Sequence, residues 1–290
     1  MTSVVVTGGS GKAGRACIKD LLAHGYAVVN VDRVPPTEQL CPWTSVDLTD
    51  FGQTIEALSG IDERIHRVDA IVHLAAIPAP GLFPNAVTFH NNMLSTYHIF
   101  EAARRLEIKN VVWASSETVL GLPFDMPPPY APLDEDYPGR PESAYSLSKL
   151  LGEEMAKQFC RWNPALKIIG LRLSNVMEPA DYARFATWQD DAQQRKWNLW
   201  GYIDARDAAQ AIRKAIEAPL TGAEVFIIAN ADTVMSRANA ELVAETYPGV
   251  PYAEGTGEHE TLLAIGRAQR LLGFEPEHSW RDEVAGGVTG

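Results

Sequence analysis

Tyr145 and Lys149 are the two side chains in this sequence whose types and spacing are best suited to chemistry. They stand four residues apart in a stretch, residues 143–162, that predicts a helix, so both should lie on one helical face about 6 Å apart. An ammonium beside a phenol favours the phenolate and should lower the tyrosine pKa from its usual value of about 10. Such a tyrosine could take a proton from an alcohol near neutral pH. Alone, the pair is much more typical of an amphipathic helix with a half-buried tyrosine and a solvated lysine.

A glycine-rich turn near the N-terminus predicts a phosphate-binding site. Residues 3–7 predict a buried strand, Gly8, Gly11 and Gly14 follow it, and a helix is expected over 13–24. Glycines at this spacing allow a tight turn and close approach of a pyrophosphate. The helix N-terminus supplies free N–H groups and the positive end of its dipole. The alternative is an ordinary turn between a strand and a helix.

Asp32 ends a second predicted strand, residues 27–31, about where the ribose-binding acid of a dinucleotide site is expected. A carboxylate there can accept hydrogen bonds from both ribose hydroxyls and would repel a 2′-phosphate, which favours NAD over NADP. Arg33 could instead partner such a phosphate. Asp32 could also be a plain turn residue.

The remaining pattern alternates strands with helices. Strands are expected over 43–46, 69–74, 110–114 and 224–229, and helices over 49–58, 84–106, 180–195, 205–218 and a short one capped by Ser236. This alternation predicts an α/β fold, a Rossmann-type doubly wound parallel sheet. We expect residues 1–176 to bind NAD and residues 177–290 to form a small substrate-binding region, part of which (about 198–230) returns to the sheet.

Composition excludes several classes of function. The net charge of −12 and the pI near 5.0 argue against a nucleic-acid-binding surface. The three cysteines are far apart and lack metal-ligand spacing, which predicts a reduced, cytoplasmic protein without a metal site. No stretch approaches the ~20 apolar residues of a membrane span, and no signal peptide is evident.

Taken together, the chain resembles the extended short-chain dehydrogenase/reductases of the NAD-dependent epimerase/dehydratase family. The matching pieces occur in the family's order: Thr7-Gly-x-x-Gly-x-x-Gly14, Asp32, Asp47-Leu48, His73-Leu74-Ala75-Ala76, Asn92, Ser115-Ser116, Tyr145-x-x-x-Lys149, Arg172-Leu-Ser-Asn175-Val176 and Tyr202-Ile-Asp-Ala-Arg-Asp207. Each piece is unspecific alone, and their joint occurrence carries the resemblance.

The resemblance implies a role for each of these residues. Tyr145 would be the general acid/base, Lys149 would hold the nicotinamide ribose, and Ser116 would bond the substrate oxygen. It also implies a homodimer formed through helices 84–106 and 143–162. The residues expected to hold NAD are Gly8, Ser10, Gly11, Lys12, Gly14, Asp32, Arg33, Asp47, Leu48, Leu74, Ala75, Ala76, Asn92, Tyr145 and Lys149.

Departures from the family bear on the reaction. Dehydratases of the family carry an Asp-Glu pair where this chain has Glu117-Thr118, and elimination needs both an acid and a base, so a dehydratase is disfavoured. Only residues 177–200 separate the Arg-x-x-Asn strand from the Tyr-Ile-Asp-x-x-Asp element, where relatives that act on nucleotide sugars insert a long segment. A small substrate is therefore expected.

In this respect the chain is similar to the uronate dehydrogenase branch, including Ala186-Thr187-Trp188. That branch often has Asn-His at positions 117–118, and a carboxylate there would repel a sugar acid, so a neutral sugar or polyol is as plausible. The residues expected at the substrate are Ser116, Glu117, Thr118, Arg172, Asn175 and Arg184. Arg172 and Arg184 could each form a structural ion pair instead.

The sequence therefore predicts an NAD-dependent oxidoreductase that removes hydride from a hydroxyl-bearing carbon of a small carbohydrate or sugar acid. A nucleotide-sugar epimerase that recycles its NAD within each turnover is the alternative. A non-catalytic NAD sensor is disfavoured, because it has no need of Ser116, Tyr145 and Lys149.

Overall fold

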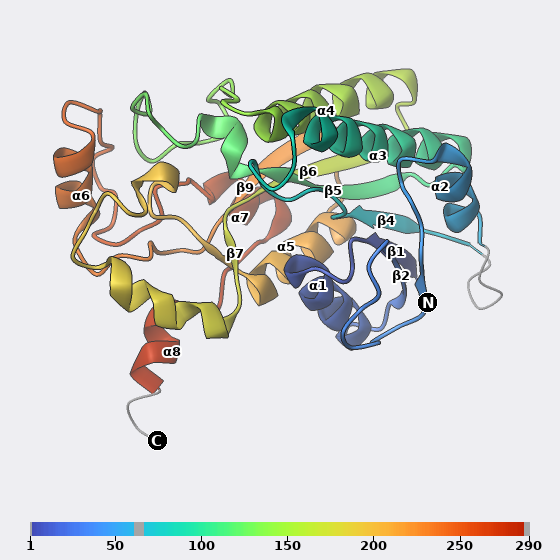
Figure 1. Cartoon of the computed structure of the whole chain (residues 1–290), viewed down its shortest axis with the longest axis horizontal. Helices are drawn as coiled ribbons and strands as arrows, with labels where there is room; N and C mark the ends of the chain where they lie inside the picture. The colour runs from blue at the N-terminus through green and yellow to red at the C-terminus, as the bar shows by residue number, and fades with distance from the viewer. Residues whose placement is uncertain (1, 61–66, 287–290) are drawn as a thin grey trace.

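The computed structural model describes residues 2–60 and 67–286 and contains a seven-stranded sheet in which every pairing is parallel (Figure 1). The strand order is β3-β2-β1-β4-β5-β6-β9, which confirms the predicted Rossmann-type doubly wound fold. The strands are β1 (Ser3–Thr7), β2 (Ala27–Val31), β3 (Trp43–Thr44), β4 (Ala70–His73), β5 (Asn110–Ser116), β6 (Lys167–Leu173) and β9 (Gly222–Ile228).

Alternating side chains in β1 explain why helices cover both faces of the sheet. Val4 and Val6 belong to one hydrophobic cluster, which includes α1 (Lys12–Ala23) and α5 (Ala205–Glu217). Val5 points to the opposite face and belongs to a second cluster. Because successive side chains of a strand point to opposite faces, a continuous run of valines requires a helical layer on each side. The second layer consists of α2 (Phe51–Leu58), α3 (Asn85–Arg105) and α4 (Ala144–Trp162).

The order of the strands changes side at β1. From β1 the chain proceeds to β2 and β3 on one side, and it then crosses to β4 on the other side. In doubly wound sheets ligands bind in the crevice at this switch point, beyond the carboxyl ends of the strands. In the register, Thr7 at the end of β1 pairs with His73 at the end of β4. The loops that follow these two residues therefore form the two walls of the crevice.

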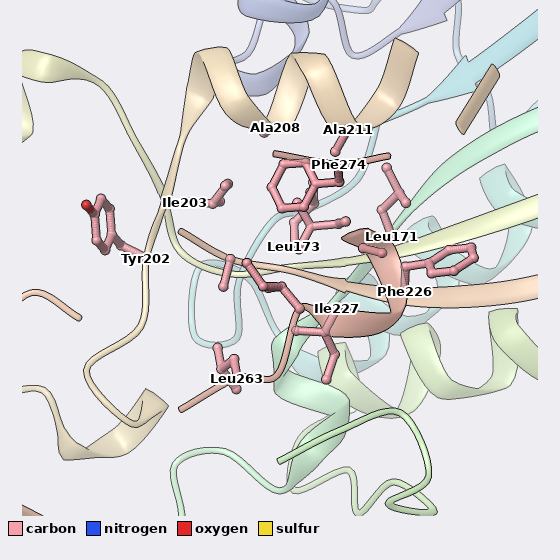
Figure 2. Close-up of a cluster of buried hydrophobic side chains, with 14 of the residues drawn as sticks. Leu171, Leu173, Tyr202, Ile203, Ala208, Ala211, Phe226, Ile227, Leu263 and Phe274 are labelled. Atoms are coloured by element: carbon pink, nitrogen blue, oxygen red, sulfur yellow. The ribbon is translucent and has the colours of Figure 1, made fainter. Parts of the chain in front are cut away.

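The C-terminal region contributes both to the sheet and to a separate lobe. Strand β9 joins the edge of the sheet beside β6, whereas β7 (Val176–Met177) pairs with β8 (Ile203–Asp204) in a separate two-stranded sheet. Figure 2 shows Ala208 and Ala211 of α5 on one side of a buried cluster with Leu171, Leu173 and Phe226, into which Phe274 from the C-terminal region inserts. Three short helices complete this region: α6 (Asn239–Thr246), α7 (Gly266–Leu272) and α8 (Trp280–Gly286).

The expected α-helix over residues 180–195 is wrong. A 3₁₀-helix, η2 (Pro179–Trp188), is followed by turns and a second short 3₁₀-helix, η3 (Lys196–Asn198). The buried residues of η2 are Tyr182, Phe185 and Trp188. A 3₁₀-helix has three residues per turn, so aromatic residues spaced by three all point to one side, whereas an α-helix would spread them.

Ser236 does not cap a helix, because α6 begins at Asn239 with Ala238 as its N-cap. The backbone N and the hydroxyl of Ser236 both donate to Gln189 Oε1, at 2.7 and 2.8 Å. Gln189 thus binds the Ser236 hydroxyl that was expected to cap the helix. Most other boundaries of helices and strands lie within one or two residues of those expected. Strand β3, for example, spans two residues where four were expected.

Within residues 2–60 and 67–286, no helix is both long and apolar enough to cross a membrane, and no group of three or more His, Cys, Asp or Glu side chains could hold a metal ion. Cys17, Cys41 and Cys160 are all free thiols. Burial raises the pKa of Cys160 to about 11, which makes its thiol a poor nucleophile.

Helix α4 approaches the sheet closely because Gly152 lies against the ring of Trp113. A Cβ at position 152 would stand 2.7 Å from Trp113 Cη2. We expect Gly152→Ala to lower the free energy of unfolding by about 1–3 kcal/mol, since overpacking forces the helix away from the sheet. Urea unfolding followed by tryptophan fluorescence measures the change.

Gly52→Ala is the matched control, because Gly52 is an exposed helical glycine whose Cβ would meet only the Asp50 side chain, at 3.1 Å. This change should be neutral or stabilising by up to about 1 kcal/mol, because alanine has the higher helix propensity. Equal destabilisation at both positions would contradict the packing argument.

Candidate active site

Helix α4 positions Tyr145 and Lys149 because its start is fixed by a reciprocal cap. Ser143 is the N-cap residue: its Oγ accepts from Ser146 N at 3.1 Å, and its own N donates to Ser146 Oγ at 2.9 Å. This capping box begins the helix at Ala144. Tyr145 therefore lies in the first turn and Lys149 one turn further, on the same face, as predicted.

Strand β5 brings Ser116 to the same place. The strand ends at Ser116, whose Oγ accepts hydrogen bonds from Thr118 N (3.2 Å) and Thr118 Oγ1 (3.0 Å). The hydroxyl of Ser116 lies close enough to the phenol of Tyr145 to lower the pKa of that phenol. Both side chains are less than a tenth exposed. Thr118 thus fixes the position of the Ser116 oxygen.

Lys149 lies between Tyr145 and the strand. Its Nζ donates to the carbonyl of Ala114 at 2.7 Å and stands 5.7 Å from the ring centroids of both Tyr145 and Trp113. The side chain is 4% exposed, and this burial lowers the pKa of Lys149 to about 8. Desolvation disfavours the charged form of a lysine, so Lys149 loses its proton more readily than an exposed lysine does.

The expected lowering of the Tyr145 pKa is wrong for this structure. Burial raises the pKa of Tyr145 to about 12, the hydrogen bond from Ser116 opposes the rise, and the charge of Glu117 adds to it. Lys149 faces the ring of Tyr145 from 5.7 Å and has its own hydrogen bond to a carbonyl. Desolvation of the phenolate therefore outweighs the attraction between the two groups.

Arg172 forms a structural ion pair, one of the two roles considered for it. Its Nε and Nη2 donate to the two carboxylate oxygens of Glu153, both at 2.9 Å, and both side chains are 5% exposed. Ser115 Oγ donates to the same carboxylate at 2.6 Å. Arg172 thus lies behind the strand end rather than at a substrate surface. Glu153 was not predicted, although its place four residues after Lys149 on the same helical face could have indicated it.

Glu117 also points into the protein. Its carboxylate accepts from Ser174 Oγ at 2.5 Å and from Asn198 Nδ2 at 3.2 Å, and the side chain is 3% exposed. Arg195 attracts its charge, yet burial is the largest effect and raises the pKa of Glu117 to about 7. The acidic group expected to face the substrate instead joins residues 117–120, directly after Ser116, to residues 174–202. We call these two stretches the catalytic turn and the substrate segment.

Arg195 holds the substrate segment together. Its guanidinium lies 4.8 Å from the ring centroids of both Trp188 and Trp197. Its Nη1 donates to Asn175 Oδ1 at 3.0 Å and its Nη2 to the carbonyl of Gly201 at 2.8 Å. The half-buried Asn175 thus has its amide oxygen engaged within the protein.

Arg184, the second arginine expected at the substrate, lies on the exposed side of the same segment. Its guanidinium stands 5.7 Å from the ring centroid of Trp188. It therefore does not share the buried bonds that occupy Arg172 and Arg195.

The glycine-rich turn fits a dinucleotide pyrophosphate. Gly8 has φ +72°, and a Cβ there would lie 2.6 Å from Ala75 N, in the loop that follows β4. A Cβ on Gly14 would lie 2.2 Å from the Gly8 carbonyl, and Gly11 N donates to that same carbonyl at 3.1 Å. No side chain larger than that of glycine fits at position 8 or at position 14. The backbone at the start of α1 is therefore free to approach a ligand.

Asp32 lies at the end of β2 beside this turn. Its carboxylate accepts from Ser10 N at 3.0 Å and from Val34 N at 3.1 Å, and the side chain remains partly exposed. This geometry fits the ribose-binding role predicted for it. Arg33 is exposed and stands 3.8 Å from the carboxylate of Asp47.

The other predicted cofactor residues surround the same crevice. Leu48 is buried, and Leu74, Ala75 and Ala76 are half-buried in the loop after β4. Asn92 on α3 holds this loop: its Oδ1 accepts from Ile77 N at 2.8 Å and its Nδ2 donates to the Ile77 carbonyl at 3.1 Å. Its amide therefore shapes the wall of the crevice. A contact between Asn92 and NAD stays a prediction.

Comparison with known proteins places this geometry in a family. Residues 4–229 match the model of the NAD dependent epimerase/dehydratase family. UDP-glucose 4-epimerase of Mus musculus is 30% identical over 219 residues, which cover 70% of this chain and 61% of that protein. Uronate dehydrogenase of Pseudomonas syringae pv. tomato is 27% identical over 187 residues, 64% of each chain. The chain thus spans less than two thirds of the length of these curated relatives.

Solved structures resemble the whole chain. UDP-galactose 4-epimerase is 26% identical, with a TM-score of 0.70 over 98% of this chain and 96% of that one. A mutated uronate dehydrogenase, 23% identical, has a TM-score of 0.69 over 98% and 86%. UDP-glucose 4-epimerase from Bifidobacterium longum in complex with NAD⁺ and UDP, 20% identical, has a TM-score of 0.71 over 98% and 96%. The latter two likenesses concern the fold alone.

The raised pKa of Glu117 predicts a pH dependence of stability. Folding favours the protonated carboxyl, so this contribution to stability is complete below the unfolded pKa of about 4.5 and is lost as the pH rises through about 7. In Glu117→Gln no charge is buried at high pH. We expect the free energy of unfolding of the variant, relative to the unaltered protein, to rise by about 2–3 kcal/mol between pH 5 and pH 8. Urea unfolding at several pH values measures it, and parallel pH profiles would contradict the assignment.

Proposed function

The chain belongs to the NAD-dependent epimerase/dehydratase family, whose cofactor is NAD, and we propose that it is a dehydrogenase of a small carbohydrate or sugar acid. The observation that carries this proposal is the substrate segment, which is short and uses its own polar side chains internally. Such a segment leaves few groups for a nucleotide diphosphate. It suits a substrate small enough to lie between the segment and the catalytic turn.

The catalytic residues have distinct roles in this proposal. The glycine-rich turn and Asp32 would hold NAD, which would supply the hydride acceptor for the substrate carbon. Tyr145 takes the proton of the hydroxyl on that carbon, and Ser116 holds the same oxygen through its hydroxyl. Lys149 provides the positive charge that favours phenolate during the transfer. Because its pKa is about 8, the ammonium is largely protonated at neutral pH.

The contacts of Glu117 remove an objection to an acidic substrate. A carboxylate facing the substrate would repel a sugar acid, yet Glu117 accepts its hydrogen bonds from Ser174 and Asn198 and is 3% exposed. Arg184 adds an exposed positive charge at the same segment. These features support a sugar acid at least as well as a neutral sugar.

A nucleotide-sugar epimerase is the second candidate, supported by the curated relatives, several of which are UDP-glucose 4-epimerases. It would use the same Tyr145, Lys149 and Ser116. An epimerase returns the hydride to the substrate within each turnover, so it accumulates no NADH. A dehydrogenase releases NADH continuously.

NADH absorbance therefore decides between the two functions. The protein is mixed with NAD and, in turn, with free sugars, hexuronates, polyols and UDP-sugars. We expect steady accumulation of NADH with a free sugar or hexuronate. Interconversion of a UDP-sugar, detected by chromatography without accumulation of NADH, would establish the epimerase instead.

Tyr145→Phe tests the acid/base within the same assay. We expect turnover to fall about 10²- to 10⁴-fold, because the variant lacks the group that moves the proton. NADH binding, measured by fluorescence, should persist. The control is Tyr26→Phe, which removes a surface hydroxyl bonded to Glu217 at 2.9 Å and should leave turnover unchanged. Unaltered turnover in Tyr145→Phe would refute its assignment.

A homodimer through α3 and α4 is also proposed. The two helices lie side by side on one face of the molecule (Figure 1) and expose several large apolar side chains: Val87, Tyr97, Leu147, Leu151 and Trp162. Apolar groups gathered on one face favour association, and two-fold symmetry lets the same face serve both chains.

Light scattering at micromolar concentration tests this assembly. We expect twice the chain mass of 31.8 kDa, and Leu151→Glu should shift the mass toward one chain by placing a charge in the apolar face. Leu271→Glu is the control, because Leu271 is similarly exposed but lies on α7. A single-chain mass for the unaltered protein would refute the dimer.

A further inference from the structure

Two ion pairs connect the start of α1 to the start of η2. Lys12 Nζ lies 2.5 Å from Asp181 Oδ2, and Arg15 Nη2 lies 2.8 Å from Glu178 Oε1. Lys12 is the first residue of α1 and directly follows Gly11 of the glycine-rich turn. The pairs therefore cross from the pyrophosphate cradle to the substrate segment, which lies far along the chain. We call these four side chains the clasp.

Both ends of the clasp are tied to the backbone of the elements they join. Arg15 Nη1 donates to the carbonyl of Ser10 at 3.0 Å, within the glycine-rich turn. Asp181 Oδ2 accepts from Glu178 N at 2.8 Å, in the cap that begins η2. Because the side chains are held in this way, the beginning of η2 cannot move away from the cradle without breaking the ion pairs.

A cavity lies beside the clasp and gives η2 room to move. It measures about 680 Å³, and its walls include Arg15, Glu178, Pro179 and Ala180 as well as residues of α5. Interiors without such a space resist displacement because every shift creates overlaps. On its α1 and α5 side, the start of η2 therefore borders open space, and the clasp rather than packing holds it there.

The clasp is weak enough to open often. The exposed fractions are 43% for Lys12 and 20% for Asp181, and 27% for Arg15 and 36% for Glu178. Ion pairs at such solvent-accessible positions typically change an equilibrium by only about two- to fivefold each, and salt weakens them further. Two pairs together can slow a motion without preventing it.

From these contacts we propose that Glu178 and Asp181 gate the exchange of the dinucleotide cofactor. The clasp closes the substrate segment over the pyrophosphate cradle, and it must open both for NAD to enter and for NADH to leave. This inference deepens the proposed dehydrogenase function, which requires the cofactor to exchange in every turnover. If the clasp is closed both in the free protein and in the protein with bound cofactor, it slows association and dissociation of the cofactor by the same factor. The affinity for the cofactor is then unchanged.

Stopped-flow fluorescence with NADH as the probe tests the gate and needs no sugar substrate. The association rate constant is obtained from the NADH dependence, and the dissociation rate constant from displacement by excess NAD. In Glu178→Gln/Asp181→Asn, in which asparagine can still cap η2, both constants should rise about three- to twentyfold, with Kd unchanged within twofold. Glu178→Gln alone, which leaves Lys12 paired, should raise both about two- to fivefold.

The matched control is Glu245→Gln, which breaks a similarly exposed ion pair with Arg237 (2.6 Å) elsewhere in the C-terminal region. It should leave both rate constants unchanged, and 1 M KCl should bring the unaltered protein close to the double variant. Unchanged rates in a folded double variant would overturn the gate and leave the proposed function standing. A lower Kd, with Lys12 released to bind the pyrophosphate, or a rise in dissociation alone would also overturn it. Failure of NADH to bind the unaltered protein would refute gate and function together.

Discussion

The buried ion pair between Glu153 and Arg172 is the interaction on which the site depends. Two parallel hydrogen bonds of 2.9 Å join α4 to β6, and Ser115 adds a third from β5. Removing one partner of such a pair typically costs 3–5 kcal/mol, because the other charge stays buried. The pair thus holds together the helix that carries Tyr145 and the strand end that carries Ser116.

A second set of polar contacts extends this arrangement into the substrate segment. Glu117 follows Ser116 directly, and its carboxylate reaches Ser174 and Asn198. Arg195, placed between two indole rings, binds Asn175 and Gly201. These charged side chains are therefore engaged within the protein, which supports the proposal of a small substrate.

Burial also sets the proton chemistry. Desolvation acts in opposite directions on the two catalytic groups: it raises the pKa of Tyr145 to about 12 and lowers that of Lys149 to about 8. Both changes favour the neutral forms. A phenolate at Tyr145 therefore needs a compensating charge or hydrogen bond, and in the proposed mechanism Lys149 supplies that charge.

The sequence by itself determined the fold and the arrangement of the proposed catalytic pair, because both depend on local spacing. A valine run needs helices on both faces, glycines at 8, 11 and 14 need a tight turn, and a four-residue step puts Tyr145 and Lys149 on one helical face. Only the tertiary structure decided what the charged residues do. Arg172 and Glu117 were expected at the substrate, but their partners Glu153, Ser174 and Asn198 come from distant parts of the chain. The direction of the Tyr145 pKa shift was misjudged for the same physical reason: spacing gives the distance to a neighbouring charge, whereas burial, which dominates here, exists only once the chain has folded.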